Sequence, residues 1–465
     1  MKKRLLATLL CAAMAVTTLA GCGSDNSGAS GNTADSGQTA QQSTDTGNGG
    51  QAAANASTEA NLVFAWWGNQ TRQERTEAAI DLYSQQNPGV TFDAQPAAWD
   101  DYWSKLATSA AGNSLPDLIQ MDYSYLEQYV ASGLLADLTP YVDNGTLDVS
   151  NVPKSLLEAG SVDGKLYAIA AGVNAPSLLY NKTLMTELGI EVPDNMTIAQ
   201  FEDICKQVYE KKGIKTDLPY GASDNYLPYL ARANDVTALF NKDEKKMNMS
   251  DSTPLVDYFQ VYQDGAEQGW VIGTDIHAEL QNNSVEQSPL VFYSSEASQA
   301  WCAFFWSNQM EAMQKVADEK GIEIGITTWP SKDPKKSNFL KPSQFFSVSR
   351  DAGANEEAAV KVVDFLTNSV DANNILLGER GVPASSVVAD AISPLVSETT
   401  QEVTRFINDV VSPNCSAISP AIPDGANEVY DESNKLVDKV LNKEIDAKTA
   451  AQNLFDKGNE IMASK

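Results

Sequence analysis

The chain of 465 residues has little of the chemistry that most catalytic and metal sites need. It contains one histidine, His277, and five cysteines, no two of which form a Cys-x-x-Cys pair. Neither a zinc cluster nor a disulfide framework is therefore indicated. A Ser-His-Asp or Cys-His catalytic set would have to use His277, which lies in no recognisable motif. We interpret this histidine as structural or surface, and we expect no metal and no cofactor.

Positive charge is also scarce. Lys and Arg number 33 against 61 Asp and Glu, which gives a formal net charge of −28 at pH 7. A balance this acidic argues against a nucleic-acid partner and against a patch for anionic lipid. The length exceeds that of a single ordinary core and suggests two or three domains.

The long apolar run of this chain is confined to its beginning. A basic start, Lys2-Lys3-Arg4, precedes a mostly apolar stretch over residues 5–18 that is too short to span a bilayer stably. The following residues, Leu19-Ala20-Gly21-Cys22, resemble the lipobox of bacterial lipoproteins. The resemblance implies a signal peptide over residues 1–21, a lipid on Cys22, and an anchor in the cell membrane that faces the extracytoplasmic side.

A low-complexity segment follows the cysteine. Residues 23–58 consist almost entirely of Gly, Ser, Asn, Gln, Thr, Ala and Asp, which offer almost nothing to a core. We expect residues 22–59 to form a lipidated, disordered tether rather than a domain.

The first ordered stretch runs from Leu62 to Arg72. Residues 62–65 are apolar and predict a short buried strand, as in a parallel sheet covered on both faces. Trp66, Trp67 and polar residues follow where the strand ends. Two rings beside the Asn69 amide and the Arg72 guanidinium suit a sugar, because rings stack on C–H faces and polar groups bond hydroxyls. Neighbouring residues of a strand point to opposite faces, so one of the two tryptophans can belong to the core.

Strands then alternate with helices. Thr71 followed by Glu74 fits a capping box at the start of the first helix, over about residues 73–86. Strands are predicted at 90–94 and 118–121, and helices at 100–111 and from 122 to about 132. This order implies a parallel sheet with right-handed crossovers, whose carboxyl ends meet at one edge and hold the ligand. That edge would carry Trp66, Trp67, Trp99, Asp122 and Tyr123.

Further along, Asp163-Gly164 signals a hairpin turn, and Thr197 starts a helix. Strands are predicted at 178–181, 290–293 and 345–348, and residues 325–330 read as the end of a strand. A helix is expected over 356–369, and the remainder of the chain reads as mainly helical.

Three groups of residues, in this order, carry a family resemblance. Residues 114–119 (Ser-Leu-Pro-Asp-Leu-Ile) precede Ala131-Ser132-Gly133-Leu134-Leu135. Residues 163–169 (Asp-Gly-Lys-Leu-Tyr-Ala-Ile) precede Leu179-Tyr180-Asn181-Lys182. Asn368-Ser369 precedes residues 378–384 (Gly-Glu-Arg-Gly-Val-Pro-Ala). Together with the lipobox, this order resembles a family 1 extracellular solute-binding protein of an ABC importer, the group that includes maltose-binding protein. The chain departs from the family in having Ala170 where proline is usual.

The resemblance implies an α/β fold of the type II periplasmic-binding-protein kind, with two lobes, three crossovers and a ligand cleft between the lobes. The first lobe would take residues 60–170 and 331–374, and the second 171–330 and 375–465. It also implies a binding protein rather than an enzyme, which delivers a carbohydrate to ABC permease subunits. We expect a monomer.

The predicted ligand site combines residues from both lobes. The first lobe supplies Trp66, Trp67, Asn69, Arg72, Trp99, Asp122 and Tyr123. Asn174, Trp301 and Trp329 would face them from the second lobe or the hinge. Alternatives stay open for several of these residues: Asp122 also suits a helix N-cap, Arg72 can pair with Asp122 or Glu74, and Trp301 and Trp329 can be core residues.

Two other functions compete with carbohydrate binding. A binding protein for another solute, such as a polyamine, would also use aromatic rings and carboxylates, although the Arg72 guanidinium argues against a cation. A secreted glycoside-acting enzyme would use paired carboxylates, which are plentiful here but lie in no recognisable motif.

Overall fold

The structure is a computed structural model that describes residues 59–280, 285–420 and 422–465. The predicted signal peptide, Cys22 and nearly all of the predicted tether lie outside these residues. Within the described part of the chain, no helix has the length and apolar character needed to cross a bilayer.

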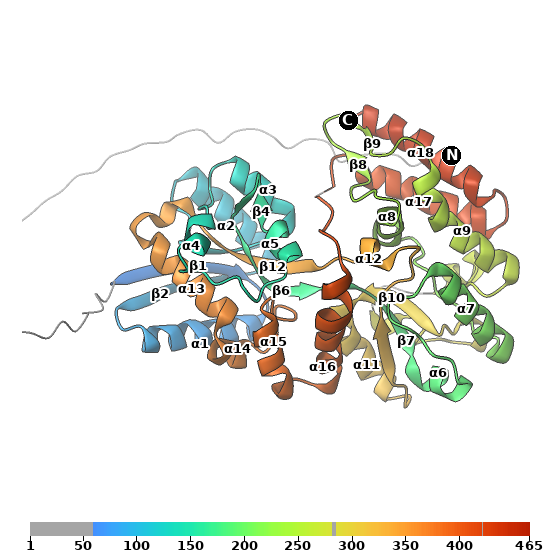
Figure 1. The fold of residues 1–465 in the computed structure, drawn as a ribbon, viewed down its shortest axis with the longest axis horizontal. Helices are drawn as coiled ribbons and strands as arrows, with labels where there is room; N and C mark the ends of the chain where they lie inside the picture. Colours follow the sequence, from blue (N-terminus) through green and yellow to red (C-terminus); the bar gives the residue numbers. More distant parts are fainter. Residues whose placement is uncertain (1–58, 281–284, 421) are drawn as a thin grey trace, which may run out of the picture. The chain divides into compact units, whose positions relative to one another are not determined.

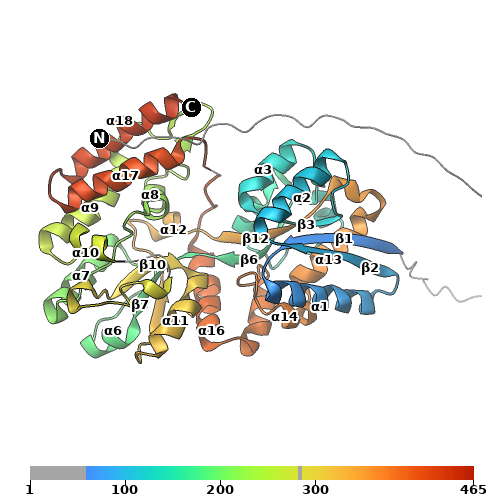
Figure 2. The same cartoon turned by 180° about the vertical axis from the view of Figure 1, so that it is seen from behind.

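The larger of the two main sheets has five strands (Figures 1 and 2). Strand β1 is parallel to β2 and β3, whereas β12 is antiparallel to both β3 and β6. The sheet order is β2 (Val90–Ala97), β1 (Ala60–Trp67), β3 (Leu118–Met121), β12 (Lys341–Val348) and β6 (Ile169–Asn174). The predicted parallel start of the fold is therefore present, with an antiparallel strand inserted from later in the chain.

Helices cover both faces of this sheet. Leu62, Phe64 and Trp66 of β1 pack in one buried cluster with α1 (Gln70–Gln86) and α13 (Glu356–Asn368). Ala65 and Trp67 pack in another with α2 (Trp99–Ala111) and α3 (Tyr123–Ala131). Alternation along the strand thus sends the two tryptophans to opposite faces, as predicted.

Of two local predictions, the capping box at Thr71 is wrong and the hairpin turn at Asp163-Gly164 is confirmed. The capping residue of α1 is Asn69 rather than Thr71, because the Asn69 side chain accepts from the Arg72 N–H at 2.9 Å and the helix begins at Gln70. The predicted hairpin is confirmed. Asp163 and Gly164 have φ values of 50° and 77°, which a type I′ turn requires, and they join β4 (Ser161–Val162) to β5 (Lys165–Leu166).

A second sheet has the order β10 (Cys302–Trp306), β7 (Pro176–Asn181) and β11 (Ile324–Thr327), and both outer strands are antiparallel to β7. Parallel bridges from Lys215 to Ala300 and from Thr216 to Val271 extend it. Its helices are α6 (Lys182–Leu188), α7 (Ile198–Lys212), α8 (Ser223–Arg232), α9 (Thr253–Gln268), α10 (Thr274–Glu279), α11 (Met310–Asp318), α17 (Ala426–Leu441) and α18 (Ala447–Ala463).

The remaining elements are short. They are α4 (Thr139–Asp143), α5 (Lys154–Ala159), β8 (Phe240–Asn241), β9 (Lys246–Met247), α12 (Pro334–Ser337), α14 (Val370–Leu376), α15 (Ser386–Ile392), α16 (Glu398–Arg405) and a π-helical turn at Phe406–Val411.

The predicted strand over 290–293 is wrong. Pro289 and Leu290 lie in a turn, and the N–H groups of Val291 and Phe292 bond to Ser288 O instead of to a neighbouring strand.

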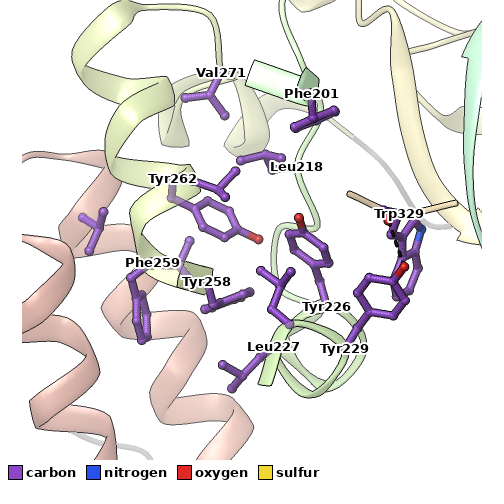
Figure 3. Close-up of a cluster of buried hydrophobic side chains, with 14 of the residues drawn as sticks. Phe201, Leu218, Tyr226, Leu227, Tyr229, Tyr258, Phe259, Tyr262, Val271 and Trp329 are labelled. Atoms are coloured by element: carbon purple, nitrogen blue, oxygen red, sulfur yellow. Dashed lines mark hydrogen bonds between the residues drawn. The ribbon is translucent and has the colours of Figure 1, made fainter. Parts of the chain in front are cut away.

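Buried aromatic side chains fill the core beside the second sheet (Figure 3). Several of their polar atoms donate to backbone carbonyls, as burial demands. The Tyr229 hydroxyl donates to Trp329 O at 2.8 Å, and the Tyr262 hydroxyl donates to Pro219 O at 2.8 Å. These bonds fix the segments that carry Pro219 and Trp329 against α8 and α9.

The chain passes between the two sheets near β6. This strand still pairs with β12 up to Asn174, and β7 of the second sheet begins at Pro176. We therefore propose Ala175 as the first lobe limit, a few residues beyond the predicted position at 170. A later passage, over residues 377–385, is tied to the first sheet by a bridge between Val173 and Val382.

A buried arginine secures this later passage. Arg380 donates from Nε to Gln120 Oε1 at 2.9 Å and from NH2 to Thr76 Oγ1 at 2.9 Å. Burial lowers the pKa of Arg380 to about 9, with a further contribution from the neighbouring Arg72. The passage is thereby locked to β3 and α1 of the first lobe.

Candidate functional site

The carboxyl edges of both sheets lie beside the first passage of the chain. Strand β6 runs in the same direction as β1, β2 and β3, because each of β3 and β6 is antiparallel to β12. The chain continues from β6 into β7, whose first residue, Pro176, pairs with Trp306, the last residue of β10. The carboxyl ends of β1–β3 and of β10 therefore lie beside the chain passage at residues 174–176, which we call the hinge. Open α/β sheets bind their ligands beyond the carboxyl ends of their strands.

Four rings form an aromatic platform at the first edge: Trp67, Trp99, Trp103 and Tyr125. The Trp67 and Trp99 ring centroids lie 5.0 Å apart in an edge-to-face arrangement, and Trp103 stacks on Tyr125 at 3.9 Å. Trp99 is 42% exposed, whereas Trp67 is only 9% exposed. The platform therefore has an exposed ring held by rings behind it.

The local sequence explains how the platform forms. Trp99 is the first residue of α2 and Trp103 lies four residues later, so both rings share one helix face. Tyr125 is contributed by α3, and Trp67 is the last residue of β1. Our sequence analysis missed Trp103 and Tyr125, although the spacing of Trp99 and Trp103 was a signal that could have identified the first of them.

Three predicted tryptophans belong to the core instead. Trp66 is fully buried, with its ring centroid 4.9 Å from that of Phe64. Trp301 is fully buried and donates from Nε1 to Thr216 Oγ1 at 2.8 Å, and Trp329 is 2% exposed and donates to Ser177 O at 2.8 Å. Trp66 and Trp301 do not present a face to solvent, so we leave them out of the proposed ligand contacts. Trp329 is also a core residue, but it lines a pocket at the edge of the second sheet.

Asn69 and Asp122 both cap helices. The Asp122 carboxylate accepts from the Ser124 N–H at 2.9 Å at the start of α3, as Asn69 does from Arg72 at the start of α1. The alternative that Asp122 is a helix N-cap is thus confirmed. The cap places the residue directly after β3, at the carboxyl edge of the sheet.

Arg72 lies in a network that joins the end of β1 to the later passage. Its Nε bonds to Glu379 at 2.6 Å, and its NH1 donates to Gln344 Oε1 at 3.0 Å and to Trp67 O at 3.1 Å. The pairing with Asp122 or Glu74 is therefore wrong.

Gly68 is required beside Arg72, because a Cβ at this position would lie 2.3 Å from the Arg72 Cδ. Arg72 positions the platform strand rather than presenting a free guanidinium.

Tyr123 and Asn174 are not brought together with the platform rings. The Tyr123 hydroxyl donates to Ser419 O at 2.9 Å, and burial raises the pKa of Tyr123 to about 12. Asn174 lines a separate cavity of about 140 Å³ beside Gly381 and Pro383, and no platform residue lines that cavity.

The second-lobe pocket is a hollow of about 430 Å³ at the edge of the second sheet. Its lining includes the segment after residue 216 and the end of β10, both at the hinge-side edge. The Tyr220 and His277 rings stack in parallel, with centroids 4.1 Å apart, and Tyr220 is 37% exposed. Its polar lining residues include Asp217, Tyr220, Asn225, His277 and Gln309. None of these was predicted from the sequence as a ligand residue.

The described lining of the pocket contains one carboxyl group and one imidazole. Asp217 is 7% exposed, and burial raises the pKa of its carboxyl from 3.8 to about 7. Burial lowers the pKa of His277 to about 4, so its imidazole is neutral at neutral pH. No lysine or arginine is among the described residues that line this pocket.

Asp217→Asn is expected to stabilise the protein above neutral pH. Because burial raises the pKa of Asp217 from 3.8 to about 7, the folded chain keeps a proton that the unfolded chain releases. Stability is therefore lost as pH rises from about 4 to about 7, by at most roughly 4 kcal/mol at about 1.4 kcal/mol for each pH unit. Thermal midpoints at about pH 8 should be several degrees higher for the variant, and the two proteins should converge towards pH 4. An equal difference at both pH values would contradict this assignment.

The described residues contain no group of three or more His, Cys, Asp or Glu side chains placed to hold a metal ion. The chemistry at the two edges is that of aromatic rings, amides, hydroxyls and one buried carboxylate. Such groups bind and orient a polar ligand through stacking and hydrogen bonds.

Comparison with known proteins identifies the family. Residues 78–402 match the family model described as bacterial extracellular solute-binding protein. The match covers more than half of the chain, so the chain belongs to this family. The family resemblance derived from the sequence is therefore confirmed.

Curated relatives are distant. A galactooligosaccharide-binding protein of Bacillus subtilis is 25% identical over 348 residues, which cover 72% of this chain and 74% of that protein. A diacetylchitobiose-binding protein of Streptomyces coelicolor is 28% identical over 212 residues, 45% of this chain and 44% of that one. Binding proteins of Brucella abortus match over 117 residues, at 26% identity, and the match spans only 28% of their length.

Solved structures show the same fold. A family 1 extracellular solute-binding protein of Alicyclobacillus acidocaldarius superposes with a TM-score of 0.75 at 22% identity, covering 87% of this chain and 98% of that one. An oligogalacturonide-binding protein of Yersinia enterocolitica gives a TM-score of 0.69 at 19% identity, with 87% and 99% covered. The two-lobe α/β fold predicted from the sequence is confirmed.

Proposed function

We propose that the chain is the oligosaccharide-binding component of an ABC importer, acting as a monomer outside the cytoplasm and handing its ligand to the permease subunits. The observation that carries the proposal is the aromatic platform at the hinge edge of the first lobe, with an exposed Trp99 ring. Flat rings stack against the C–H faces of sugars, and such a contact supplies a hydrophobic surface of defined orientation.

The second lobe supports the same ligand class. Its pocket combines the Tyr220 ring with the Asn225 amide oxygen, which can accept from a hydroxyl group, and the Gln309 amide nitrogen, which can donate to one. Ligand sites of this kind place a few polar groups among aromatic walls. The relatives named for galactooligosaccharide and diacetylchitobiose binding agree with this assignment. We infer a binding role without catalysis, because the arrangement supplies contacts rather than a reacting group.

Calorimetric titration with galacto-, arabino- and chito-oligosaccharides tests the proposal. At least one series should bind with a saturable heat, and Trp99→Ala should weaken that binding. The matched control is Phe292→Ala, which removes a ring that is 58% exposed and belongs to neither the platform nor the pocket. If none of the series binds, or if both variants bind like the parent, the platform is not a sugar site.

We also propose that Cys22 carries a lipid that anchors the mature chain to the outer face of the cell membrane, after removal of residues 1–21. The support is the order of a basic start, an apolar stretch and Leu19-Ala20-Gly21-Cys22. Two or more acyl chains give durable anchoring, whereas a single one gives marginal, reversible binding.

Replacing Cys22 with Ala should therefore release the protein from the membrane fraction. Ligand affinity of the released protein should equal that of the parent, because residue 22 precedes the first strand by 38 positions, the difference between 60 and 22. Fractionation of cells that express each form, followed by titration of the released form, measures both effects. Unchanged membrane association of the variant would contradict the lipid anchor.

A further inference from the structure

We propose that the second-lobe pocket receives a protonated amino group of the ligand against the carboxylate of Asp217, so that the solute is an oligosaccharide containing amino sugars. This inference rests on the proposed carbohydrate function and names the substrate class of the same site.

Asp217 carries a buried carboxyl group without a partner among the described residues. Asp217 is 7% exposed and lines the pocket, yet no hydrogen bond or ion pair reaches its carboxylate from the residues that the structure describes. Burial alone accounts for the rise of its pKa to about 7. A buried carboxyl without a partner keeps its proton, and a cationic ligand group at the pocket wall would stabilise the charged form that burial disfavours.

The groups around Asp217 cannot supply a positive charge. The titratable groups that influence or line its surroundings are the thiol of Cys302 on β10, the hydroxyls of Tyr262 on α9 and of Tyr220, and the imidazole of His277 on α10. Burial raises the pKa of both Cys302 and Tyr262 well above their ordinary values, raises that of Tyr220 to about 12 and lowers that of His277 to about 4. All four are therefore neutral near pH 7, and among the described residues there Asp217 is the group that gains charge.

The rest of the lining suits an ammonium group. Tyr220 and Phe305 offer aromatic rings in the same pocket, and cations are attracted to ring faces. The whole chain carries a formal charge of −28, which favours a cationic over an anionic ligand. The Asn225 amide nitrogen donates to Asp224 and the Gln309 amide oxygen accepts from the Trp306 N–H, which leaves the Asn225 oxygen and the Gln309 nitrogen for the neighbouring hydroxyls of a sugar ring.

The pocket wall is also fixed in place before ligand arrives. Leu218 follows Asp217 directly and belongs to the buried cluster drawn in Figure 3, together with Tyr226, Tyr262 and Trp329. Leu218 and Trp329 line the pocket as well. A carboxylate held on such a wall loses little further freedom when it pairs with a ligand group.

The test compares two oligosaccharide series of equal length in the full chain. Glucosamine oligomers and glucose oligomers of the same β-1,4 linkage differ at each ring in an amino group or a hydroxyl at position 2. At about pH 7, we expect the amino series to bind at least about tenfold more tightly. Asp217→Asn should lower affinity for the amino series by at least about tenfold and leave the neutral series within about twofold. Asp243→Asn, which changes an exposed aspartate that does not line the pocket, should leave both series unchanged.

Each outcome separates this inference from the proposed function. If both series bind equally and Asp217→Asn affects neither, the amino-group pairing is overturned while carbohydrate binding stands. A spermidine titration forms the third arm. If spermidine binds in a manner that requires Asp217, and neither sugar series binds, the amino-sugar ligand and the proposed carbohydrate function are both overturned. Thermal midpoints of each variant, measured alongside, show that any loss of affinity occurs in a folded protein.

Discussion

Trp99→Ala is expected to lower affinity for a bound oligosaccharide by at least about tenfold, which corresponds to about 1.4 kcal/mol. Trp99 is the exposed ring of the aromatic platform, with 42% of its surface accessible, and an aromatic contact can supply this much binding energy. The folded state should lose little, because much of the side chain is already in contact with water. Affinity should therefore fall while the thermal midpoint stays close to that of the parent.

Titration calorimetry and thermal unfolding of the same preparation distinguish the two effects. Trp99→Phe is the matched variant, since it keeps a ring at the platform edge, and it should retain most of the affinity. A thermal midpoint that falls by many degrees together with affinity would mean that Trp99 acts through the fold. Unchanged affinity in Trp99→Ala would remove the platform from the ligand site.

Trp66→Ala is expected to have the opposite profile. Trp66 is fully buried against Phe64 and the helices on the α1 side of the first sheet. Truncating a buried tryptophan to alanine leaves a cavity and costs roughly 3–5 kcal/mol of unfolding free energy. Ligand affinity of the remaining folded protein should stay within about twofold of the parent value, because the side chain points away from the platform face.

Urea denaturation of Trp66→Ala and the parent measures this loss. Trp66→Phe provides the control, since the smaller ring should recover part of the lost stability. A Trp66→Ala variant that unfolds at the parent midpoint and binds ligand weakly would contradict the placement of Trp66 in the core.

Much of the fold could be predicted because local signals and periodicity agree with it. The apolar run ending at Trp67, the Asp163-Gly164 turn and the capping residue Thr197 each specify their own element without help from the rest of the chain. The segment at 290–293 shows the limit of such reasoning. A short apolar run is also what a buried turn requires, and only its tertiary neighbours decide between the two.

The site was harder to predict from the sequence than the fold, as individual residues show. Strand alternation required Trp66 and Trp67 to face opposite sides, but which side carries α2 and the exposed Trp99 depends on helix placement. Arg72 pairs with Glu379, 307 positions away, and local sequence could not identify that partner. Asp217 has no motif, and its chemistry arises only because folding removes it from water beside a pocket.

Hydrogen–deuterium exchange with and without a saturating oligosaccharide tests most directly whether the ligand sits between the two hinge edges. The account predicts slower exchange at both edges together, in peptides covering residues 97–103 and 122–125 of the first lobe and residues 217–225 and 305–309 of the second. The outer helix α18 should be unaffected. Slower exchange confined to one lobe, or located away from both edges, would contradict the proposed site.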